Sequence, residues 1–568
     1  MNILGITAFV HDSAACLVID GQVVANAEEE RFNREKHTQA FPAQAIRYVL
    51  EAGRIAPHEI DLVTFNWNPW TSLLHELGKA LCLPLYLKIL KYNRPPKNFT
   101  TIFSSHRLRR HLQQCLGEKI SAPIKWVGHH QAHAAASYCL SPFHEADILV
   151  VDGHGENAST SCYSARGNTL TRQWTLPILS SLGILYRNFT QYLGFHDYQE
   201  GVIMALAAYG RDAYKDFFNG KVKLLPNGKI RIHSSCMGWW HYLDGAIAKE
   251  LGPLRRSLDP LTQRDKDIAA SLQACVKNSM LHMVRHLAAK SNRRNLCLGG
   301  GVFLNCDINK SILESECYDR IFIPPFTSDS GGAMGSALWG AVEAKEELKK
   351  DGAFFSPYWG PEYGPDVVES AFVQAQIPCI KSSRVCRDAA QILADGKIVG
   401  WFQGRMESGP RALGNRSILA APFDASTRDR LNDGIKKREN FRPFAPVLTE
   451  EAAEKYFEVE APLPSLAYYM LLTVHVRPEY RERLAAVVHV DGSSRIQVVT
   501  ASTNERLHRL LCEFEKLTGC AMLLNTSFNV KEPIVCSPRD ALRTYKASSL
   551  DALVMGDYVA DRDSPQVT

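Results

Sequence analysis

Residues 2–25 read NILGITAFVHDSAACLVIDGQVVA, and this stretch predicts the fold of the first part of the chain. Apolar residues 2–7 predict a strand, a polar break follows, and residues 15–19 predict a second strand. The dipeptide Asp20-Gly21 separates this strand from a third apolar run, which is the pattern of a tight hairpin turn. We therefore expect the chain to open with a strand, a polar loop, a strand, a turn and a third strand.

The same order of elements recurs about 145 residues later in the chain. Residues 148–151 predict a buried strand, residues 152–157 a polar loop rich in glycine, and residues 159–164 another strand. A turn at residues 166–168 leads into a further strand. No long stretch of identity links the two copies, so the repeat lies in the order of elements. This repetition predicts a duplicated α/β domain.

A third glycine-rich loop follows a long predicted helix. Residues 266–290 carry apolar side chains at mostly i, i+4 spacing and predict one amphipathic helix. A strand at residues 295–298, the triple glycine Gly299–Gly301 and a helix at residues 302–312 come next. Glycine lets a phosphate approach the backbone, and a helix N-terminus favours an anion. With the two polar loops above, this favours a split nucleotide-binding domain of the actin or hexokinase kind, although neither a Walker A motif nor GxGxxG occurs.

The composition is that of an ordinary globular protein. Of the 568 residues, 45% are hydrophobic and 22% are charged, which argues against wholesale disorder, collagen and coiled coil. No run of about 18 apolar residues predicts a membrane span, and no secretory pattern opens the chain, so we expect a cytoplasmic protein. The net charge of +5 is too small to indicate nucleic-acid binding. The 15 cysteines include no CxxC pair and are expected to be reduced.

A change in composition divides the chain. Residues 343–351 are dense in charge, and Ser-Pro and Gly-Pro pairs crowd the next fifteen or so residues. We therefore expect a first domain over residues 1–350 and a second α/β domain over residues 367–535. Residues 536–568 are expected to form a tail of helix and strand that packs back on the first domain.

Two histidines are candidate metal ligands. His129 and His133 follow a predicted strand, and in a helix their i, i+4 spacing places both imidazoles on one face. Asp152 at the end of a strand and Asp329 before a helix of small residues could complete the site. Two imidazoles and two carboxylates suit iron(II), zinc or manganese. The alternative is that the histidines are scattered over the surface of a helix N-terminus.

The second domain carries a basic tract. Residues 404–417 (GRMESGPRALGNRS) predict a loop rich in arginine and glycine, and residues 436–444 (KKRENFRPF) follow. Arg495 and residues 525–529 (NTSFN) come later in the chain. Arginine binds phosphate or carboxylate bidentately, and lysine adds a point charge. A basic run is often only a solvated surface, but here glycine and proline interleave with the arginines, which favours an anion-binding pocket.

Several of these segments resemble, in order and across nearly the whole length, the natural-product O-carbamoyltransferases of the NodU/CmcH type. The segment Trp401–Ser417 is the most specific of them. The other matching segments are Gly5–Ala15, Glu28–Phe32, His129–His133, Glu200–Gly210, Gly299–Asn305, Arg442–Pro446 and Asn525–Asn529.

The resemblance implies two modules. The N-terminal one is similar to the universal tRNA threonylcarbamoyladenosine transferase, an ATPase-like fold built by duplication, and the second is similar to the YrdC-like carbamoylating domain. The resemblance implies that the second module makes carbamoyl-adenylate from carbamoyl phosphate and ATP, with magnesium accompanying the ATP. The first module would then transfer the carbamoyl group to a hydroxyl of a small molecule, as in antibiotic and other secondary metabolism. The expected partner is this acceptor, with no nucleic acid and no membrane.

The resemblance also implies roles for individual residues. His11 matches the proposed general base. The ligands of the family's metal, usually iron(II), match His129, His133, Asp152 and Asp329. The nucleotide-contacting residues of the first module match Asp12, Gly153, Gly300, Gly301 and Asn305. The carbamoyl phosphate and ATP site of the second module matches Arg411, Lys436, Arg442, Arg495, Asn525 and Ser527. The match is firmer for the arginines than for Lys436, because Lys437 lies beside it.

The sequence leaves other functions open. A tRNA-modifying enzyme of the threonylcarbamoyl type, a small-molecule kinase of the hexokinase type and a non-enzymatic actin-like or chaperone-like ATP-binding protein share the predicted first fold. Residues 66–120 and 170–260 are the expected contributors to an acceptor pocket. Its candidate wall residues are Trp67, Trp70, Trp239 and Trp240. The oligomeric state also stays open, with a homodimer among the alternatives.

Overall fold

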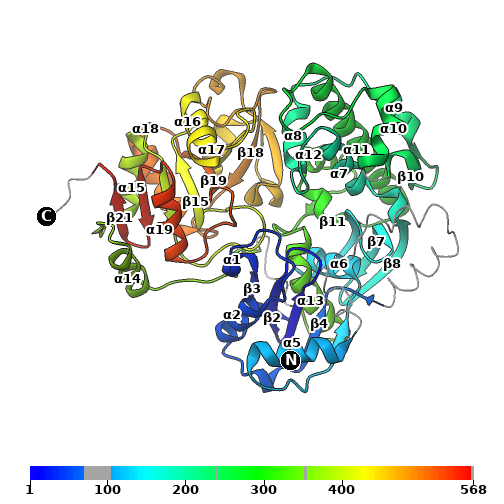
Figure 1. The fold of residues 1–568 in the computed structure, drawn as a ribbon, viewed down its shortest axis with the longest axis horizontal. Coiled ribbons are helices and arrows are strands. Elements are labelled where there is room, and N and C mark those ends of the chain that lie inside the picture. The colour runs from blue at the N-terminus through cyan, green and yellow to red at the C-terminus, as the bar shows by residue number, and fades with distance from the viewer. Residues whose placement is uncertain (70–103, 238–239, 349, 351–354, 564–568) are drawn as a thin grey trace. The chain divides into compact units, whose positions relative to one another are not determined.

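The computed structural model describes residues 1–69, 104–237, 240–348, 350 and 355–563. The chain forms two compact units, drawn in Figure 1. The first unit contains Met1–Glu29 and His37–Phe355, and the second contains Ser356–Thr568 together with Glu30–Lys36. We name Glu30–Lys36 the crossing segment, because the chain leaves the first unit at its start and returns at its end. Helix α1 (Glu30–Asn33) lies within it.

The first sheet of the first unit has the strand order β3-β2-β1-β4-β5. Strand β1 pairs antiparallel with β2, with Asn2 opposite Ile19, and parallel with β4. The predicted turn between β2 and β3 is confirmed, since Asp20 and Gly21 both have positive φ, as a tight hairpin requires. The strands are β1 (Asn2–Thr7), β2 (Ala14–Ile19), β3 (Gln22–Glu28), β4 (Leu62–Phe65) and β5 (Ile124–Trp126).

The second sheet of the same unit repeats this topology, with the order β12-β11-β6-β7-β8. In both sheets three antiparallel strands that follow one another in sequence are joined by two later, parallel strands. The predicted duplicated α/β domain is therefore confirmed. The strands are β6 (Glu145–Val151), β7 (Ala158–Arg166), β8 (Thr169–Pro177), β11 (Asn295–Gly299) and β12 (Arg320–Phe322).

Two helices rich in small residues pack against each other, and each also packs on one of the two sheets. Helix α6 (His129–Cys139) packs on β6 and β11, helix α13 (Gly332–Glu343) packs on β1 and β2, and the two helices pack on each other. A Cβ atom on Gly335 would lie 2.0 Å from the carbonyl oxygen of Ala132. Only glycine therefore allows α13 to approach α6 this closely. This contact holds in place the two helix N-termini from which candidate ligands project.

The remaining elements of the first unit surround these sheets. The helix predicted at residues 266–290 is confirmed as α11. The helix predicted at residues 302–312 is divided, because the side chain of Asn305 caps a new helix through Ile308 N after a short 3-10 turn. The elements are α2 (Ala43–Gly53), α5 (Ser105–Leu116), α7 (Leu182–Tyr192), α8 (Glu200–Ala207), α9 (Lys215–Lys221), β9 (Val222–Leu224), β10 (Ile230–Ile232), α10 (Trp240–Leu251), α11 (Gln263–Lys290) and α12 (Cys306–Glu314).

The second unit is built on a sheet with the order β13-β21-β20-β14-β15-β19-β16-β18-β17. Helices α15 and α18 pack together over it, and Leu393, Trp401, Leu510 and Leu523 lie fully buried in the resulting core. Its strands are β13 (Ile380–Lys381), β14 (Val399–Phe402), β15 (Arg416–Ala420), β16 (Ala445–Leu448), β17 (Leu472–His475), β18 (Ser493–Val498), β19 (Met522–Ser527), β20 (Ala552–Met555) and β21 (Tyr558–Asp561). Its helices are α14 (Pro365–Ala375), α15 (Val385–Ala394), α16 (Ala425–Asp429), a π-helix at Arg430–Lys436, α17 (Glu450–Tyr456), α18 (Glu505–Thr518) and α19 (Pro538–Ala547).

The structure corrects the expectation that residues 536–568 return to the first domain. Strand β20 pairs parallel with β14, inside the sheet of the second unit. All four residues of β20 are buried, so this apolar strand forms part of the core rather than a surface tail. Among the described residues, no helix is long and apolar enough to cross a membrane.

Candidate functional site

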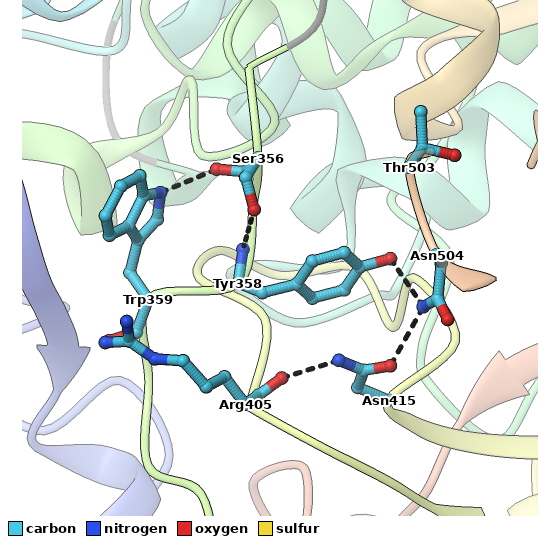
Figure 2. A pocket seen from close by; sticks show the side chains of 7 residues that line it. All are labelled: Ser356, Tyr358, Trp359, Arg405, Asn415, Thr503 and Asn504. Atoms are coloured by element: carbon cyan, nitrogen blue, oxygen red, sulfur yellow. Dashed lines mark hydrogen bonds between the residues drawn. The ribbon is translucent and has the colours of Figure 1, made fainter. Parts of the chain in front are cut away.

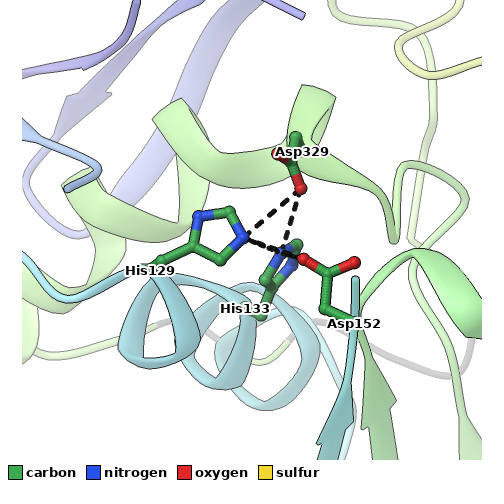
Figure 3. Close-up of side chains that lie close together, drawn as sticks. All are labelled: His129, His133, Asp152 and Asp329. Carbon is green, nitrogen blue, oxygen red and sulfur yellow. Dashed lines mark hydrogen bonds and ion pairs between the residues drawn. The ribbon is translucent and has the colours of Figure 1, made fainter. Parts of the chain in front are cut away.

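Four buried side chains from three parts of the first unit meet at one point, as Figure 3 shows. His129 and His133 lie at the start of α6, Asp152 follows β6 directly, and Asp329 precedes α13. Their ligand atoms all lie within 4.8 Å of one another. The structure thus brings together the four predicted metal ligands. Because all four are buried, the alternative of histidines scattered over a helix surface is excluded.

The distances fit a site that holds a cation. The Nε2 atoms of His129 and His133 lie 3.1 Å apart, and His129 Nε2 is 3.0 Å from Asp152 Oδ2 and 3.4 Å from Asp329 Oδ1. His133 Nε2 is 3.6 Å and 3.5 Å from the same two oxygens. Two ring nitrogens and two carboxylate oxygens converge here, which is a donor set that suits zinc, iron(II) or manganese.

Electrostatics in this cluster follow from burial and close opposite charges. Burial opposes protonation of His129, but the negative charges of Asp329 and Asp152 outweigh it and raise the His129 pKa. Burial likewise opposes ionisation of Asp152, yet His129 and His133 hold its pKa well below the usual value. The carboxylates are therefore charged at neutral pH. A bound cation would balance these two buried negative charges.

A second group of side chains adjoins this cluster. His11 Nε2 lies 3.1 Å from Asp329 Oδ2, and His11 Nδ1 lies 3.0 Å from Asp12 Oδ2. The other oxygen of Asp12 lies 2.7 Å from His37 Nδ1. The ring of Tyr198 stacks on His37 at 4.0 Å and meets the edge of His11 at 5.4 Å. Asp12 takes a left-handed backbone conformation with φ +54°, which is uncommon outside glycine. The local backbone thus turns one carboxylate toward both imidazoles.

The predicted nucleotide loop lies beside the same cluster. Gly300 has φ +101°, and a Cβ atom there would lie 2.3 Å from the carbonyl oxygen of Val151. The backbone N–H of Gly301 donates to Asp152 Oδ1 at 3.1 Å. A Cβ atom on Gly153 would meet nothing within 4 Å, so the space above this loop is open. The amide of Asn305 is engaged by the α12 cap and by Gln273.

The second unit contains a buried lysine held only by neutral groups. Lys436 Nζ donates to the carbonyl oxygen and Oγ of Ser527, at 2.5 Å and 3.2 Å, and to the carbonyl oxygen and Oδ1 of Asn529, at 2.9 Å and 2.8 Å. Burial lowers the pKa of Lys436 well below its usual value, and the charge of Arg438 lowers it further. Lys437 is exposed, so Lys436 and not its neighbour faces this part of the unit.

Other predicted residues of the second unit lie on adjacent strands. Arg495 on β18 and Asn525 on β19 each have a buried polar atom, Nε and Oδ1 respectively, without a hydrogen-bond partner among the described residues. The amide of Asn525 donates to Ala412 O at 3.2 Å, directly beside Arg411. Arg442 Nη1 lies 3.7 Å from Glu439 Oε2. Buried polar groups usually have a hydrogen-bond partner, so these two atoms beside clustered cations support a bound ligand.

Two features of the second unit were missed by sequence reasoning. Arg438 was given no role within the KKRENFRPF segment, yet its charge lowers the pKa of Lys436, and the charges of Arg442 and Arg495 lower its own pKa. The crossing segment also belongs to this unit, and Arg34 donates to the carbonyls of Ile534 and Pro533 at 2.8 Å and 2.5 Å. The basic pattern of the segment could have indicated Arg438, whereas no pattern indicates which unit the crossing segment joins.

A separate pocket of about 430 Å³ opens in the second unit, shown in Figure 2. The amide of Asn504 donates to the hydroxyl of Tyr358 and to Asn415, both at 2.9 Å, and Asn415 donates to the carbonyl of Arg405 at 2.7 Å. The polar groups of this wall therefore largely satisfy one another. Trp359, Ser356 and Thr503 complete the lining.

One of the four tryptophans proposed for an acceptor pocket lies beside the buried cluster. The ring of Trp67 is 5.5 Å from that of His129, and its side chain is buried. Trp240 begins α10. Trp70 and Trp239 lie outside the described residues.

Two family models match this chain. Residues 2–338 match the model described as "Carbamoyltransferase N-terminus", and residues 390–562 match "Carbamoyltransferase C-terminus". An uncharacterized protein of Synechocystis is 38% identical over 98% of this chain and 96% of its own length. "Nodulation protein NolNO" of Sinorhizobium fredii is 37% identical over 97% of this chain and 79% of its own length. "Nodulation protein U" of Bradyrhizobium diazoefficiens is 38% identical over 93% of this chain and 92% of its own length.

Solved structures are similar over about 60% of the chain and at low identity. Component A of (R)-2-hydroxyglutaryl-CoA dehydratase from Acidaminococcus fermentans is 14% identical, with a TM-score of 0.34 over 60% of this chain and 99% of that one. HypF from T. kodakarensis is 16% identical, also with a TM-score of 0.34, over 62% of this chain and 49% of that one.

Proposed function

Because the chain belongs to the carbamoyltransferase family, we propose that it transfers a carbamoyl group to a hydroxyl of a small molecule through a carbamoyl-adenylate. The second unit forms this intermediate from carbamoyl phosphate and ATP, and the first unit carries out the transfer. The observation that carries the proposal is the match of both family models, which together cover both units. Two chemically different candidate sites, one in each unit, support a division into two steps.

The proposed reaction balances as follows. Water cleaves carbamoyl phosphate to carbamate and inorganic phosphate, and an oxygen of carbamate attacks the α-phosphorus of ATP. The bond between the α- and β-phosphates breaks, and pyrophosphate leaves. The acceptor hydroxyl then attacks the carbonyl carbon of carbamoyl-adenylate, AMP leaves, and the hydroxyl proton passes to a base. Each step forms one bond to phosphorus or carbon and breaks one, so the sequence of steps balances.

In the second unit, cations would bind the phosphates. Arg411, Arg442 and Arg495 supply planar guanidinium groups, which bind phosphate bidentately. Lys436 adds a charge that no described carboxylate pairs with directly, and Ser527 fixes its position. The buried Oδ1 of Asn525 and Nε of Arg495 lack partners among the described residues, which supports a bound ligand here.

In the first unit, the residues His129, His133, Asp152 and Asp329 would hold the metal, with iron(II) the expected ion and zinc or manganese as alternatives. A cation there supplies a Lewis acid that polarises the carbonyl of the intermediate. His11 would accept the proton of the acceptor hydroxyl at an imidazole nitrogen, and Asp12 holds that ring in place through Nδ1. Gly153, Gly300 and Gly301 would leave room for the adenylate beside Asp152.

The deciding experiment supplies the full-length protein with ATP, carbamoyl phosphate and candidate alcohols, and follows pyrophosphate. We expect pyrophosphate release that depends on carbamoyl phosphate, and a carbamate ester on the alcohol that is used. Arg411→Ala should abolish pyrophosphate release while transfer from supplied carbamoyl-adenylate continues. Absence of any dependence on carbamoyl phosphate would exclude the proposal and leave an ATP-binding protein of another kind.

A tRNA substrate is the main alternative acceptor. It predicts binding to tRNA that weakens steeply with salt, because each phosphate contact releases counterions. A small hydroxyl acceptor predicts no such binding. Titration of the full-length protein with unmodified tRNA at two salt concentrations distinguishes the two acceptors independently of the adenylate step.

A further inference from the structure

The loop between β14 and β15 folds around the side chain of Glu407. This side chain is 2% exposed, and its Oε1 accepts from the backbone N–H groups of Leu413 at 2.8 Å, Asn415 at 2.7 Å and Arg416 at 3.1 Å. Hydrogen bonds to an ionised oxygen are about twice as strong as neutral ones. One buried carboxylate therefore joins the start of this loop to its end, and Arg411 lies between the two.

The backbone of Glu407 is itself anchored. Met406 N donates to the carbonyl oxygen of Pro361 at 3.0 Å, and Glu407 forms an isolated antiparallel bridge with Tyr358. The carboxylate thus extends from a segment that a neighbouring stretch of chain holds in place. It can therefore fix the position of the more distant part of the loop.

The end of the loop depends on this carboxylate for its backbone N–H groups. Gly414 has φ +106°, and a Cβ atom there would lie 2.2 Å from Leu507 Cδ2, so the backbone takes a conformation that suits glycine. The carbonyl oxygen of Leu413 accepts from the side chain of Gln497 on β18 at 2.8 Å, whereas the N–H of Leu413 donates to Glu407. Loss of the carboxylate would therefore release the N–H side of this segment and leave its carbonyl side bonded.

Glu407 also acts on a buried cation. Arg416 is fully buried, and its guanidinium donates to the carbonyl oxygens of Gln403 at 2.6 Å and Pro361 at 3.0 Å. Burial lowers the pKa of Arg416, and the negative charge of Glu407 opposes this effect. The second oxygen of Glu407, Oε2, is buried without a hydrogen-bond partner among the described residues. A glutamine here would keep a carbonyl oxygen for the loop but bury an amide N–H₂ at a place that offers no described acceptor.

We propose that Glu407 is a positioning residue of the phosphate site of the second unit: it fixes the backbone that follows Arg411, and so the direction in which the Arg411 guanidinium meets a phosphate group, without contacting the ligand. The inference rests on the proposed function where it takes Arg411 as a phosphate ligand.

The sign of the effect distinguishes positioning from simple electrostatics. A negative charge near an anion site weakens anion binding, so removal of the Glu407 charge alone would tighten it. Positioning predicts weaker binding, because a loosened loop has to lose more conformational freedom when Arg411 contacts the anion.

The test is a double-mutant cycle in the full-length protein, with wild type, Glu407→Gln, Arg411→Ala and both changes together. Calorimetric titration at fixed salt measures the binding of inorganic triphosphate and of carbamoyl phosphate, each alone. Arg411→Ala should weaken the anion that Arg411 contacts by about tenfold or more. For that anion, we expect Glu407→Gln to weaken binding about three- to tenfold when Arg411 is present, and less than about twofold when Arg411 is absent.

Two further variants separate charge from shape. Glu407→Asp keeps the charge but shortens the side chain, so it should also weaken binding only when Arg411 is present. The matched control is Glu362→Gln, which removes an exposed carboxylate whose charge also acts on Arg416. It should leave the affinity within about twofold of wild type.

Three outcomes would overturn the inference alone. These are tighter binding by Glu407→Gln, equal weakening with and without Arg411, and a lower melting temperature with unchanged affinity, which would leave Glu407 only a role in supporting the fold. If Arg411→Ala weakens neither anion, the proposed role of Arg411 fails and the inference fails with it. Carbamoyl-phosphate-dependent pyrophosphate release by wild type is scored separately, and its absence would exclude the proposed function while the cycle still decides on Glu407.

Discussion

The carboxylate of Asp12 shows how one residue can organise its neighbours. Its two oxygens lie 3.0 Å from His11 Nδ1 and 2.7 Å from His37 Nδ1, so both rings are held by one side chain. Burial disfavours a proton on His11, but the charges of Asp329 and Asp12 outweigh it and raise the His11 pKa to about 9. A cation held by Asp329 and Asp152 would offset those charges and lower this pKa, as the role of a base requires. Tyr198 covers both rings on one side. His11 is thus fixed at the edge of the buried cluster, where the proposed transfer needs a group to accept the proton of the acceptor hydroxyl.

Replacing His11 separates the two proposed half-reactions. His11→Ala should lower transfer from supplied carbamoyl-adenylate by about 10²–10⁴-fold, the usual contribution of a general base, and leave pyrophosphate release unchanged. Single-turnover transfer and pyrophosphate release are measured on the same preparation. The control is His58→Ala, an exposed histidine of the same unit, which should match wild type in both assays. Unchanged transfer in His11→Ala would remove this residue as the base.

The charge of Glu532 should set the alkaline limit of the first half-reaction. Lys436 has a lowered pKa, so kcat/KM for carbamoyl phosphate should fall as pH rises through a value below 10.5. The negative charge of Glu532 raises the Lys436 pKa, and Glu532→Gln removes that charge. The fall should therefore move to lower pH, which a pH profile of kcat/KM measures. Glu479→Gln, an exposed change in the same unit, should not move it, and a shift to higher pH in Glu532→Gln would contradict the assignment of Lys436.

Sequence patterns identified site residues well where their spacing determines which face of a helix the side chains occupy. The i, i+4 spacing of His129 and His133 places both on one face of α6, and the structure has both beside Asp152. Spacing did not indicate that Asp12 would hold two histidines, because that contact depends on a left-handed backbone and on a ring 25 residues away. The predicted roles of these residues remain predictions until the assays above are made.

At the scale of elements, the approach of α6 and α13 decides whether the buried cluster can form. Each helix carries ligands at or near its N-terminus, and the two sheets below them hold the helices at a fixed distance. Gly335 of α13 lies against Ala132 of α6, and on its other side α13 packs on β1, where Gly5 lies against Ala333. This packing has no room for one additional methyl group. Close packing of backbone on backbone therefore sets the geometry of the candidate metal site.

A methyl group at this crossing should disturb the metal site. Gly335→Ala places a Cβ atom 2.0 Å from Ala132 O, so we expect a loss of about 1–3 kcal/mol in unfolding free energy and weaker metal binding. The matched control is Gly201→Ala in α8, where a Cβ atom meets nothing within 4 Å and should stabilise by about 0.5–1 kcal/mol. Chemical denaturation and titration with iron(II) or zinc measure both effects. Equal stability of the two variants would contradict the close crossing.

Elements were predictable where local pattern and turn chemistry agree. The Asp20-Gly21 hairpin and the long helix α11 follow from local sequence alone. The division of the helix predicted at residues 302–312 depends on a cap by Asn305, which competes with the apolar pattern around it. The position of β20 was not predictable, because a short apolar strand carries no information about which sheet it joins.

At the scale of the whole molecule, the crossing segment makes the second unit depend on residues far away in sequence. Arg31 is buried and donates to Gly409 O at 2.8 Å, within the loop that carries Arg411. Its Nη1 also lies 3.1 Å from Glu30. The loop of the candidate anion site is therefore braced by the N-terminal part of the chain. A domain boundary predicted from composition assigns one continuous stretch of sequence to each domain. Such a boundary could not assign the crossing segment to the second unit.

Loss of this brace should loosen the loop locally. Arg31→Met removes the bond to Gly409 and leaves its carbonyl without this donor, which costs about 1–3 kcal/mol. Hydrogen exchange of residues 404–416 should become faster, while exchange in α6 stays as in wild type. The control is Arg543→Met, an arginine of the same unit that is 73% exposed and should leave exchange in the loop unchanged. If hydrogen exchange of residues 404–416 were unchanged in the Arg31→Met variant, the crossing segment would not brace this loop.

The crossing segment also has a genetic consequence. The chain passes between its units three times, at Glu29, Lys36 and Phe355, whereas joining two finished proteins end to end would give a single passage. A gene cut before the codon for Ser356 would therefore yield a C-terminal product that lacks seven of its own residues. Exchange of halves between related genes would have to carry the codons for Glu30–Lys36 along with those for the C-terminal half. The two halves are thus expected to be inherited as one reading frame rather than as exchangeable cassettes.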